Sequence, residues 1–175
     1  MADQIYNIDE VFEMAEQMER NGARFYRTAA KNFEANIATE MLLELAAMED
    51  DHERVFIRMR ERIAAKEFGD GMYDPQGEAG QYMQAMMHGK VFGVEGDPSR
   101  QLKGEEPLAD ILRTAILLEK DTIAFYSGIK ILMPEDLGQK KVDSIIREEM
   151  SHVTLLNRRL EQTLKDTSPG MPNVW

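Results

Sequence analysis

The 175-residue sequence contains no cysteine. Disulfide bonds, thiolate-bound zinc, iron–sulfur clusters and thiol catalysis are therefore excluded, because each of them needs cysteine side chains. The absence says little about the compartment, since a protein of the reducing cytosol and a cysteine-free exported protein would share it.

Basic residues are in the minority, and the formal net charge is −11. Nucleic acid is not an expected partner, because binding to phosphates requires a basic surface. An acidic surface can raise the local concentration of cations, although solubility alone is a sufficient explanation for this charge.

Long apolar runs are missing as well. No stretch approaches the ~18 consecutive apolar residues that a membrane span requires. The first residues, MADQIYNIDE, lack the basic region followed by an apolar run that marks a secretory signal. A cytoplasmic protein without membrane contact is therefore expected. The length and the 43% hydrophobic content suit one globular domain over residues 1–175.

Alternating β-branched runs, which would indicate strands, are also absent, whereas apolar residues recur at helical spacing in four long segments. We expect an all-α four-helix bundle with helices over residues 8–33, 36–67, 107–132 and 134–166. The connection over residues 68–106 is long for a loop in a compact domain, and Glu78–His88 could form a short helix within it. As a crossover it would let the second and third helices run parallel. His88 is expected to be polar surface.

The sequence repeats itself at an offset of 100 residues. The residues that recur are mainly those able to carry chemistry: Glu19 and Glu119, Tyr26 and Tyr126, Glu49 and Glu149, His52 and His152. Elsewhere the two halves share mostly apolar character, so identity between them is concentrated at candidate site residues.

Helical geometry gathers these residues. Glu49 and His52 are three positions apart and so occupy one face of a helix, and the second half repeats this spacing. Glu19 precedes the expected turn near Glu34 by as many residues as Glu49 follows it. Both glutamates should therefore lie at one height of an antiparallel hairpin, and the second hairpin shows the same symmetry around Pro134.

Four carboxylates in a bundle core indicate bound cations. An unpaired buried carboxylate costs roughly several kcal/mol, and two divalent ions would balance the four charges. One glutamate from each of two helices with Glu-x-x-His from two others is the di-iron carboxylate arrangement. Oxygen and imidazole donors suit two iron ions, or manganese or a mixed pair, better than copper or structural zinc. The expected ligands are Glu19, Glu49, His52, Glu119, Glu149 and His152. The alternative is ordinary core histidines with surface glutamates.

Tyr26 and Tyr126 each follow a candidate ligand, Glu19 or Glu119, by about two helical turns on the same face. They could hydrogen-bond a ligand carboxylate or gate electron transfer, or they could be core aromatic residues with satisfied hydroxyls. Their recurrence in both halves favours a role beside the metal ligands.

These paired motifs resemble those of the rubrerythrin family within the ferritin-like superfamily, over about Ile8 to Leu164. The resemblance implies a ferritin-like bundle, a non-haem di-iron centre, peroxide reduction as the best-known activity, and a homodimer. Rubrerythrins also carry a rubredoxin domain with a four-cysteine iron site. Because this chain has no cysteine, the electron donor is expected to be another molecule, such as a rubredoxin-type protein or a flavin reductase. An additional glutamate of rubrerythrins is replaced here by Ile116, which leaves a symmetric site closer to that of ferritin-like oxidases.

Two functions remain open at this point. In the first, a di-iron oxidoreductase reduces hydrogen peroxide or dioxygen, with Glu49 and Glu149 bridging the metals, Glu19 and Glu119 as terminal ligands, and one histidine on each metal. In the second, an iron-binding ferroxidase oxidises iron and holds or delivers it without a turnover substrate. A scaffold with a vestigial site is disfavoured by the intact set of six ligands.

Overall fold

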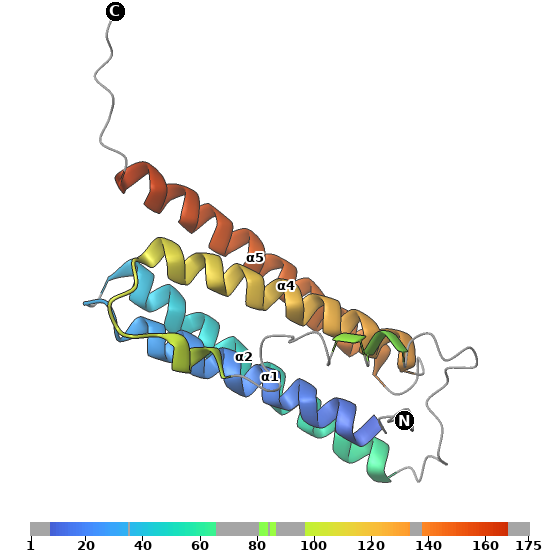
Figure 1. Ribbon diagram of the computed structural model, residues 1–175. Helices are drawn as coiled ribbons and strands as arrows, with labels where there is room; N and C mark the ends of the chain where they lie inside the picture. Colours follow the sequence, from blue (N-terminus) through green and yellow to red (C-terminus); the bar gives the residue numbers. More distant parts are fainter. Residues whose placement is uncertain are drawn as a thin grey trace, which may run out of the picture.

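A computed structural model describes residues 8–34, 36–65, 81–83, 85–86, 97–133 and 138–167. Four long helices form a bundle (Figure 1): α1 (Ile8–Ala30), α2 (Ile37–Ala65), α4 (Leu108–Leu132) and α5 (Gln139–Thr167). No strand occurs in these ranges. The expected all-α four-helix bundle is therefore confirmed. None of the described helices is both long and apolar enough to cross a bilayer.

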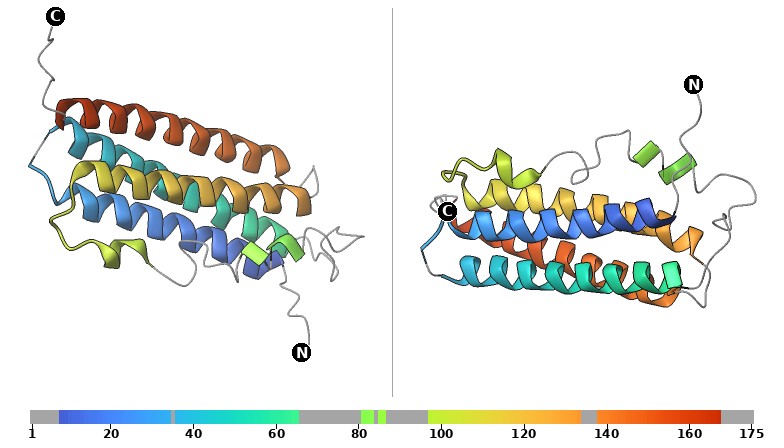
Figure 2. Two further views of the ribbon diagram at one scale, coloured as in Figure 1. Left: turned by 45° about the horizontal axis from the view of Figure 1, so that its top comes forward. Right: turned by 90° about the horizontal axis from the view of Figure 1, so that it is seen from below.

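The bundle consists of two antiparallel hairpins, α1–α2 and α4–α5. Figure 2 shows that α2 and α4 run in the same direction, as a long crossover between them requires. At the end of the crossover the short helix η1 (Pro98–Gln101) lies beside α1, where Arg24 forms an ion pair with Asp97. Residues 66–80, 84 and 87–96 of the crossover region, including His88, lie outside the described residues.

One piece of the crossover packs on α4. Residues 81–83 and 85–86 are helical, within the short helix expected for this region. The Tyr82 hydroxyl donates a hydrogen bond to the Ala124 carbonyl oxygen at 2.9 Å, and Met83 is buried. The close approach requires a glycine on α4, because a Cβ atom at Gly128 would lie 2.4 Å from the Met83 sulfur.

The helix ends follow local chemistry. Asn36 caps α2, since its side-chain oxygen accepts hydrogen bonds from the amides of Ala38 (2.8 Å) and Thr39 (3.1 Å). Helix α1 ends at Ala30 rather than at residue 33. Helix α5 begins at Gln139 rather than at residue 134, directly after Gly138, whose φ of 130° is a conformation that a helix does not contain. Residues 134–137 are outside the described ranges.

Two apolar clusters fill the core, and each of the four helices contributes to both. The first contains Phe12, Phe56, Phe125 and Val142, and the second contains Phe25, Leu42, Leu112 and Leu156. Along every helix, the expected metal ligands fall between the residues of the first cluster and those of the second. A band of buried acidic and imidazole groups therefore crosses the bundle between two apolar layers.

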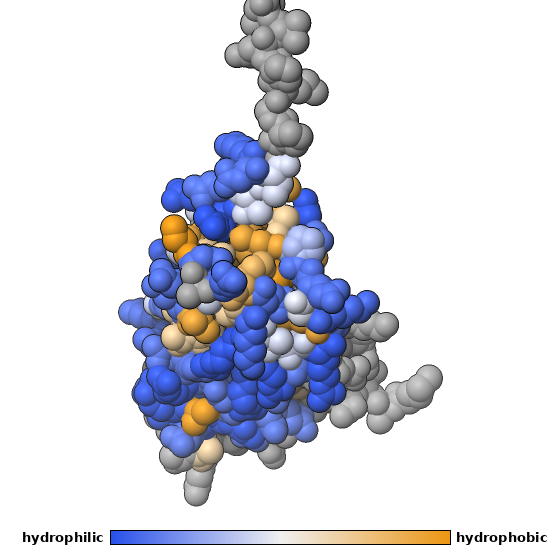
Figure 3. All heavy atoms as spheres, turned by 90° about the vertical axis from the view of Figure 1, so that its left-hand side faces the viewer, coloured by the Kyte–Doolittle hydropathy of each residue, from blue (hydrophilic) through white to orange (hydrophobic). Residues whose placement is uncertain are grey.

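Seen from the end at which α1 joins α2, the surface is mostly hydrophilic, with a group of apolar side chains near its middle (Figure 3).

Candidate metal centre

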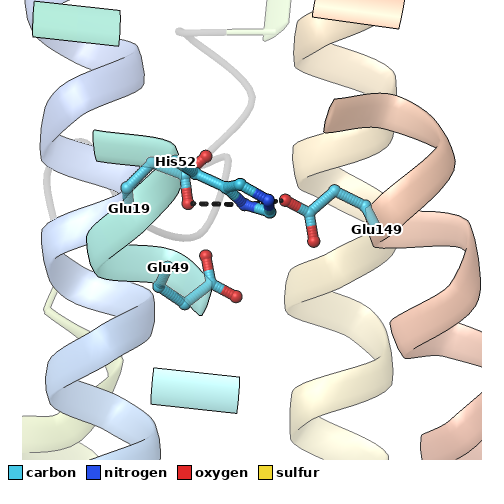
Figure 4. Close-up of side chains that lie close together, drawn as sticks. All are labelled: Glu19, Glu49, His52 and Glu149. Atoms are coloured by element: carbon cyan, nitrogen blue, oxygen red, sulfur yellow. Dashed lines mark ion pairs between the residues drawn. The ribbon is translucent and has the colours of Figure 1, made fainter. Parts of the chain in front are cut away.

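The structure brings all six expected ligands together in the middle of the bundle. Helices α1 and α4 contribute one glutamate each, and α2 and α5 contribute one glutamate and one histidine each. All six residues are at most 4% exposed. Figure 4 shows Glu19, Glu49, His52 and Glu149 converging on one space from three helices.

Two groups of possible ligand atoms can be distinguished. In each group, one atom from every residue lies within 4.8 Å of the others. The first group consists of Glu19, Glu49, His52 and Glu149, and the second of Glu49, Glu119, Glu149 and His152. Glu49 and Glu149 belong to both groups, whereas each histidine belongs to one. The two groups of ligand atoms are therefore adjacent and share two carboxylates.

The Glu149 carboxylate lies between the two imidazoles. Its Oε1 is 2.8 Å from His52 Nδ1, and its Oε2 is 2.8 Å from His152 Nδ1. Glu19 Oε2 is 3.8 Å from His52 Nδ1, and Glu119 Oε1 is 3.6 Å from His152 Nδ1. The two rings are nearly parallel, with centroids 6.0 Å apart. In both histidines, Nδ1 is the nitrogen that faces the site.

Within the described part of the chain, several atoms around this space lack a hydrogen bond of good geometry. They are Oε2 of Glu19, both carboxylate oxygens of Glu149, and Nδ1 of His52 and of His152. Buried polar atoms without partners are rare, because leaving water without compensation is costly. These five atoms belong to four of the six expected ligands. Oxygen donors with one imidazole nitrogen on each side fit two iron or manganese ions.

Burial and mutual repulsion keep protons on part of the carboxylates. Burial raises the pKa of Glu49 well above its usual value, and the charges of Glu149 and Glu19 raise it further. Burial and the Glu149 charge likewise raise the pKa of Glu119 to about 8. Glu149 behaves in the opposite way: burial opposes its charge, but the close imidazoles of His152 and His52 hold its pKa at about 2.

The histidines carry the compensating charge in the metal-free protein. Burial lowers the pKa of each imidazole, but neighbouring carboxylates outweigh this effect. The close carboxylates of Glu149 and Glu19 raise the pKa of His52 to about 11, and those of Glu119 and Glu149 raise the pKa of His152 to about 9. At neutral pH, protons therefore occupy the space in which divalent cations would provide the same compensation.

The two tyrosines contact the ligands of the opposite hairpin. The Tyr26 hydroxyl donates a hydrogen bond to Glu119 Oε1, and the Tyr126 hydroxyl donates one to Glu19 Oε1. Both phenols are completely buried, and burial together with the facing carboxylates raises their pKa. They therefore keep their protons at neutral pH and orient one oxygen of each carboxylate. The sequence indicated a contact with ligands but not this crossed pairing.

Sequence reasoning missed four neighbours of the site. Glu148 and Met48 lie beside the outer nitrogens of the histidines. Gly22 leaves room for Glu49, because a Cβ atom there would be 3.3 Å from the Glu49 carboxyl carbon. A small cavity between α1 and α4 reaches Glu49 and Glu119, and Pro98 of η1 lines it. Glu148 and Met48 could have been found from the sequence by comparing the positions at which the two halves differ.

No protein-family model matches this chain, and no curated protein sequence matches it. A crystal structure from Thermotoga maritima does, with a TM-score of 0.69 and 24% sequence identity over 92% of this chain and 99% of that one. That protein is described as a candidate ferritin-like diiron-carboxylate protein. At this identity, the likeness shows the fold, and the chain has the ferritin-like fold.

Proposed function

We propose that this chain is a di-iron protein of the rubrerythrin type that reduces hydrogen peroxide or dioxygen. One observation carries the proposal: two groups of buried ligand atoms share Glu49 and Glu149 and have one histidine each. A four-helix bundle gains nothing in stability from such a cluster of buried acids without cations. The structural neighbour, described as ferritin-like and diiron-carboxylate, points the same way.

In this proposal, two iron ions would be held between Glu49 and Glu149, which belong to both groups of ligand atoms. Glu19 and His52 would complete one side, and Glu119 and His152 would complete the other. When bound there, the metals supply two electrons, which with two protons convert hydrogen peroxide into two water molecules. Tyr26 and Tyr126 fix the terminal carboxylates through their hydroxyl hydrogen bonds. Because the pKa values of both phenols are raised, the tyrosines hold these carboxylates in position and do not act as proton donors.

The cavity beside the site gives a small oxidant and protons a route to it. The cavity beside the site is lined by the side chains of Asn21 and Thr122 in addition to Glu49 and Glu119. It can admit a molecule of the size of peroxide or water, and its polar side chains can hydrogen-bond that molecule. The apolar clusters on both sides keep bulk water away from the remaining faces of the centre. Protons would therefore enter by the cavity.

In this proposal the electrons come from another molecule, since these 175 residues contain no cysteine for a rubredoxin-type iron site. A rubredoxin-type protein or a flavin reductase has the required chemistry. The rubrerythrin resemblance also favours a homodimer. Both partners belong to the proposal.

A second function, ferroxidase activity with iron storage or delivery, is favoured by one residue. Ile116 is 6% exposed and packs in the second apolar cluster. The chain thus has an apolar side chain where rubrerythrins have an additional carboxylate, and neither metal gains an alternative ligand on α4 at that position.

Stopped-flow mixing of the anaerobically prepared ferrous protein with hydrogen peroxide or with dioxygen separates the two functions. Peroxide should oxidise the centre faster than dioxygen, with sustained turnover only after addition of a reductant. If dioxygen reacts faster and ferric iron accumulates beyond two ions per chain, the iron-handling function is correct instead. The variant Glu49→Ala/Glu149→Ala is the control, since it should react with neither oxidant at the site.

A further inference from the structure

The two histidines have different neighbours on the side that faces away from the site. His52 Nε2 is 3.1 Å from Glu148 Oε2. His152 Nε2 is 3.2 Å from the sulfur of Met48. Each contact crosses from one hairpin to the other, and each involves the residue directly before a bridging glutamate. Residues 48 and 148 are equivalent in the repeat, so this is the same position filled by a thioether in one half and a carboxylate in the other.

Glu148 is held in place for this contact. Its second oxygen, Oε1, accepts a hydrogen bond from the Ser144 hydroxyl at 3.1 Å. Ser144 lies one turn earlier on α5, and its equivalent on α2 is Glu44, which cannot donate such a bond as a carboxylate. Ser144, Glu148 and His52 therefore form a connected series that ends at the metal-facing Nδ1.

Met48 provides much less to His152. A thioether sulfur is a weak, uncharged acceptor. Among the residues that the structure describes, no carboxylate is paired with the outer nitrogen of His152, whereas that of His52 faces Glu148. A carboxylate that accepts the outer N–H bond raises the basicity of the ligating nitrogen and fixes the ring and its tautomer.

We propose that Glu148 makes the Glu19–His52 side the tighter of the two metal sites, so that the first metal ion binds there and the second binds beside His152. The proposal rests on the proposed di-metal function and adds an order of filling to it. Loss of such an outer carboxylate typically lowers metal affinity by 10- to 100-fold. Because half of the Glu148 side chain is exposed (51%), we expect its loss to lower the metal affinity of the His52 side by about 10-fold, near the lower limit of that range.

The test uses the metal-free protein and Co(II), which does not change oxidation state on binding. Calorimetric titration gives the two stepwise affinities, and an anomalous difference map of crystals loaded with one equivalent shows which side is occupied. For the wild type we expect two resolved steps and a peak beside His52. Glu148→Met should weaken the first step by about 10-fold, and Met48→Glu should strengthen the second.

The double exchange Met48→Glu/Glu148→Met is the decisive variant. It keeps composition and net charge but should move the first equivalent to the His152 side. Glu44→Met, which removes an exposed carboxylate that contacts neither imidazole, is the matched control and should leave the order unchanged. Equal occupancy of both sides in the wild type, or an unchanged order of filling in the double exchange, would overturn the inference. If two Co(II) ions still bind in that case, the two-metal site on which the proposed function rests is upheld. Uptake of no Co(II) by the wild type would overturn both.

Discussion

The hairpins α1–α2 and α4–α5 are alike toward the metal centre and different away from it. Toward the centre, each presents a glutamate, a Glu-x-x-His pair and a tyrosine at matching positions. Away from it, α1 is covered by η1 through the Arg24–Asp97 ion pair, whereas α4 is covered by Tyr82 and Met83. The inner residues depend on one another across the bundle, so a change in one half would affect the site of the other. The outer residues are free of this constraint and have diverged.

The shared carboxylates are the strongest link between the halves. We expect Glu49→Ala/Glu149→Ala to lose both metal ions, since each ion would lose two of its four ligands, while the helical circular dichroism signal persists. Elemental analysis after iron loading measures the effect. A matched pair of substitutions at exposed glutamates away from the site, Glu44→Ala and Glu161→Ala, should retain two ions. Full occupancy in the Glu49/Glu149 variant would disprove the ligand assignment.

In the metal-free protein, the protons held by the two histidines and by Glu119 should make the stability depend on pH. The histidines titrate near 6.5 when unfolded and near 9 and 11 when folded, and Glu119 titrates near 8 instead of 4.5. The folded metal-free protein therefore binds more protons than the unfolded chain between pH 6.5 and 9, so its stability falls as pH rises through this range. Glu149, with its pKa lowered to about 2, adds stability that is lost only under acid conditions.

Denaturant unfolding in the presence of a chelator, at pH 6 and pH 9, measures this decline. The metal-loaded protein should not show it, because bound cations replace these protons. A metal-free protein that gains stability between pH 6 and pH 9 would contradict the assignment of the protons.

The six ligands, their shared height and the parallel arrangement of α2 and α4 follow from the sequence, because they depend on helical spacing and on identity between the halves. Glu148 and Met48 could not be found in that way, since a search for repeated residues passes over a position at which the halves differ. The crossed tyrosine contacts depend on how the hairpins are placed in space. The start of α5 depends on Gly138, whose positive φ leaves no trace in the apolar periodicity.

The crossed tyrosines allow the two sides to be perturbed separately. Tyr26→Phe removes the hydrogen bond to Glu119 and should weaken the His152 side by about 10-fold, although Tyr26 belongs to the other hairpin. Tyr126→Phe removes the hydrogen bond to Glu19 and should weaken metal binding on the His52 side by a similar factor. Co(II) titration with site assignment by anomalous scattering distinguishes the two. Weakening of the metal site on the same hairpin as the substituted tyrosine would show that the contacts are not crossed in solution.

Gly22 offers the mildest perturbation. Its equivalent in the second half is Thr122, so only one half has a glycine here. Gly22→Ala places a methyl group 3.3 Å from the Glu49 carboxyl group; a shift of a few tenths of an ångström relieves this contact. We expect metal affinity to fall by a few-fold at most and the cavity to narrow. Thr122→Ala should leave affinity unchanged, and an equal loss in both variants would assign the effect to the cavity lining rather than to Glu49.

The central claim is that two metal ions lie side by side between the hairpins and share Glu49 and Glu149. An anomalous difference map of crystals saturated with iron tests it most directly. Our account predicts two peaks per chain, one next to His52 Nδ1 and one next to His152 Nδ1, both in contact with Glu49 and Glu149. A single peak, or peaks away from these carboxylates, would contradict it.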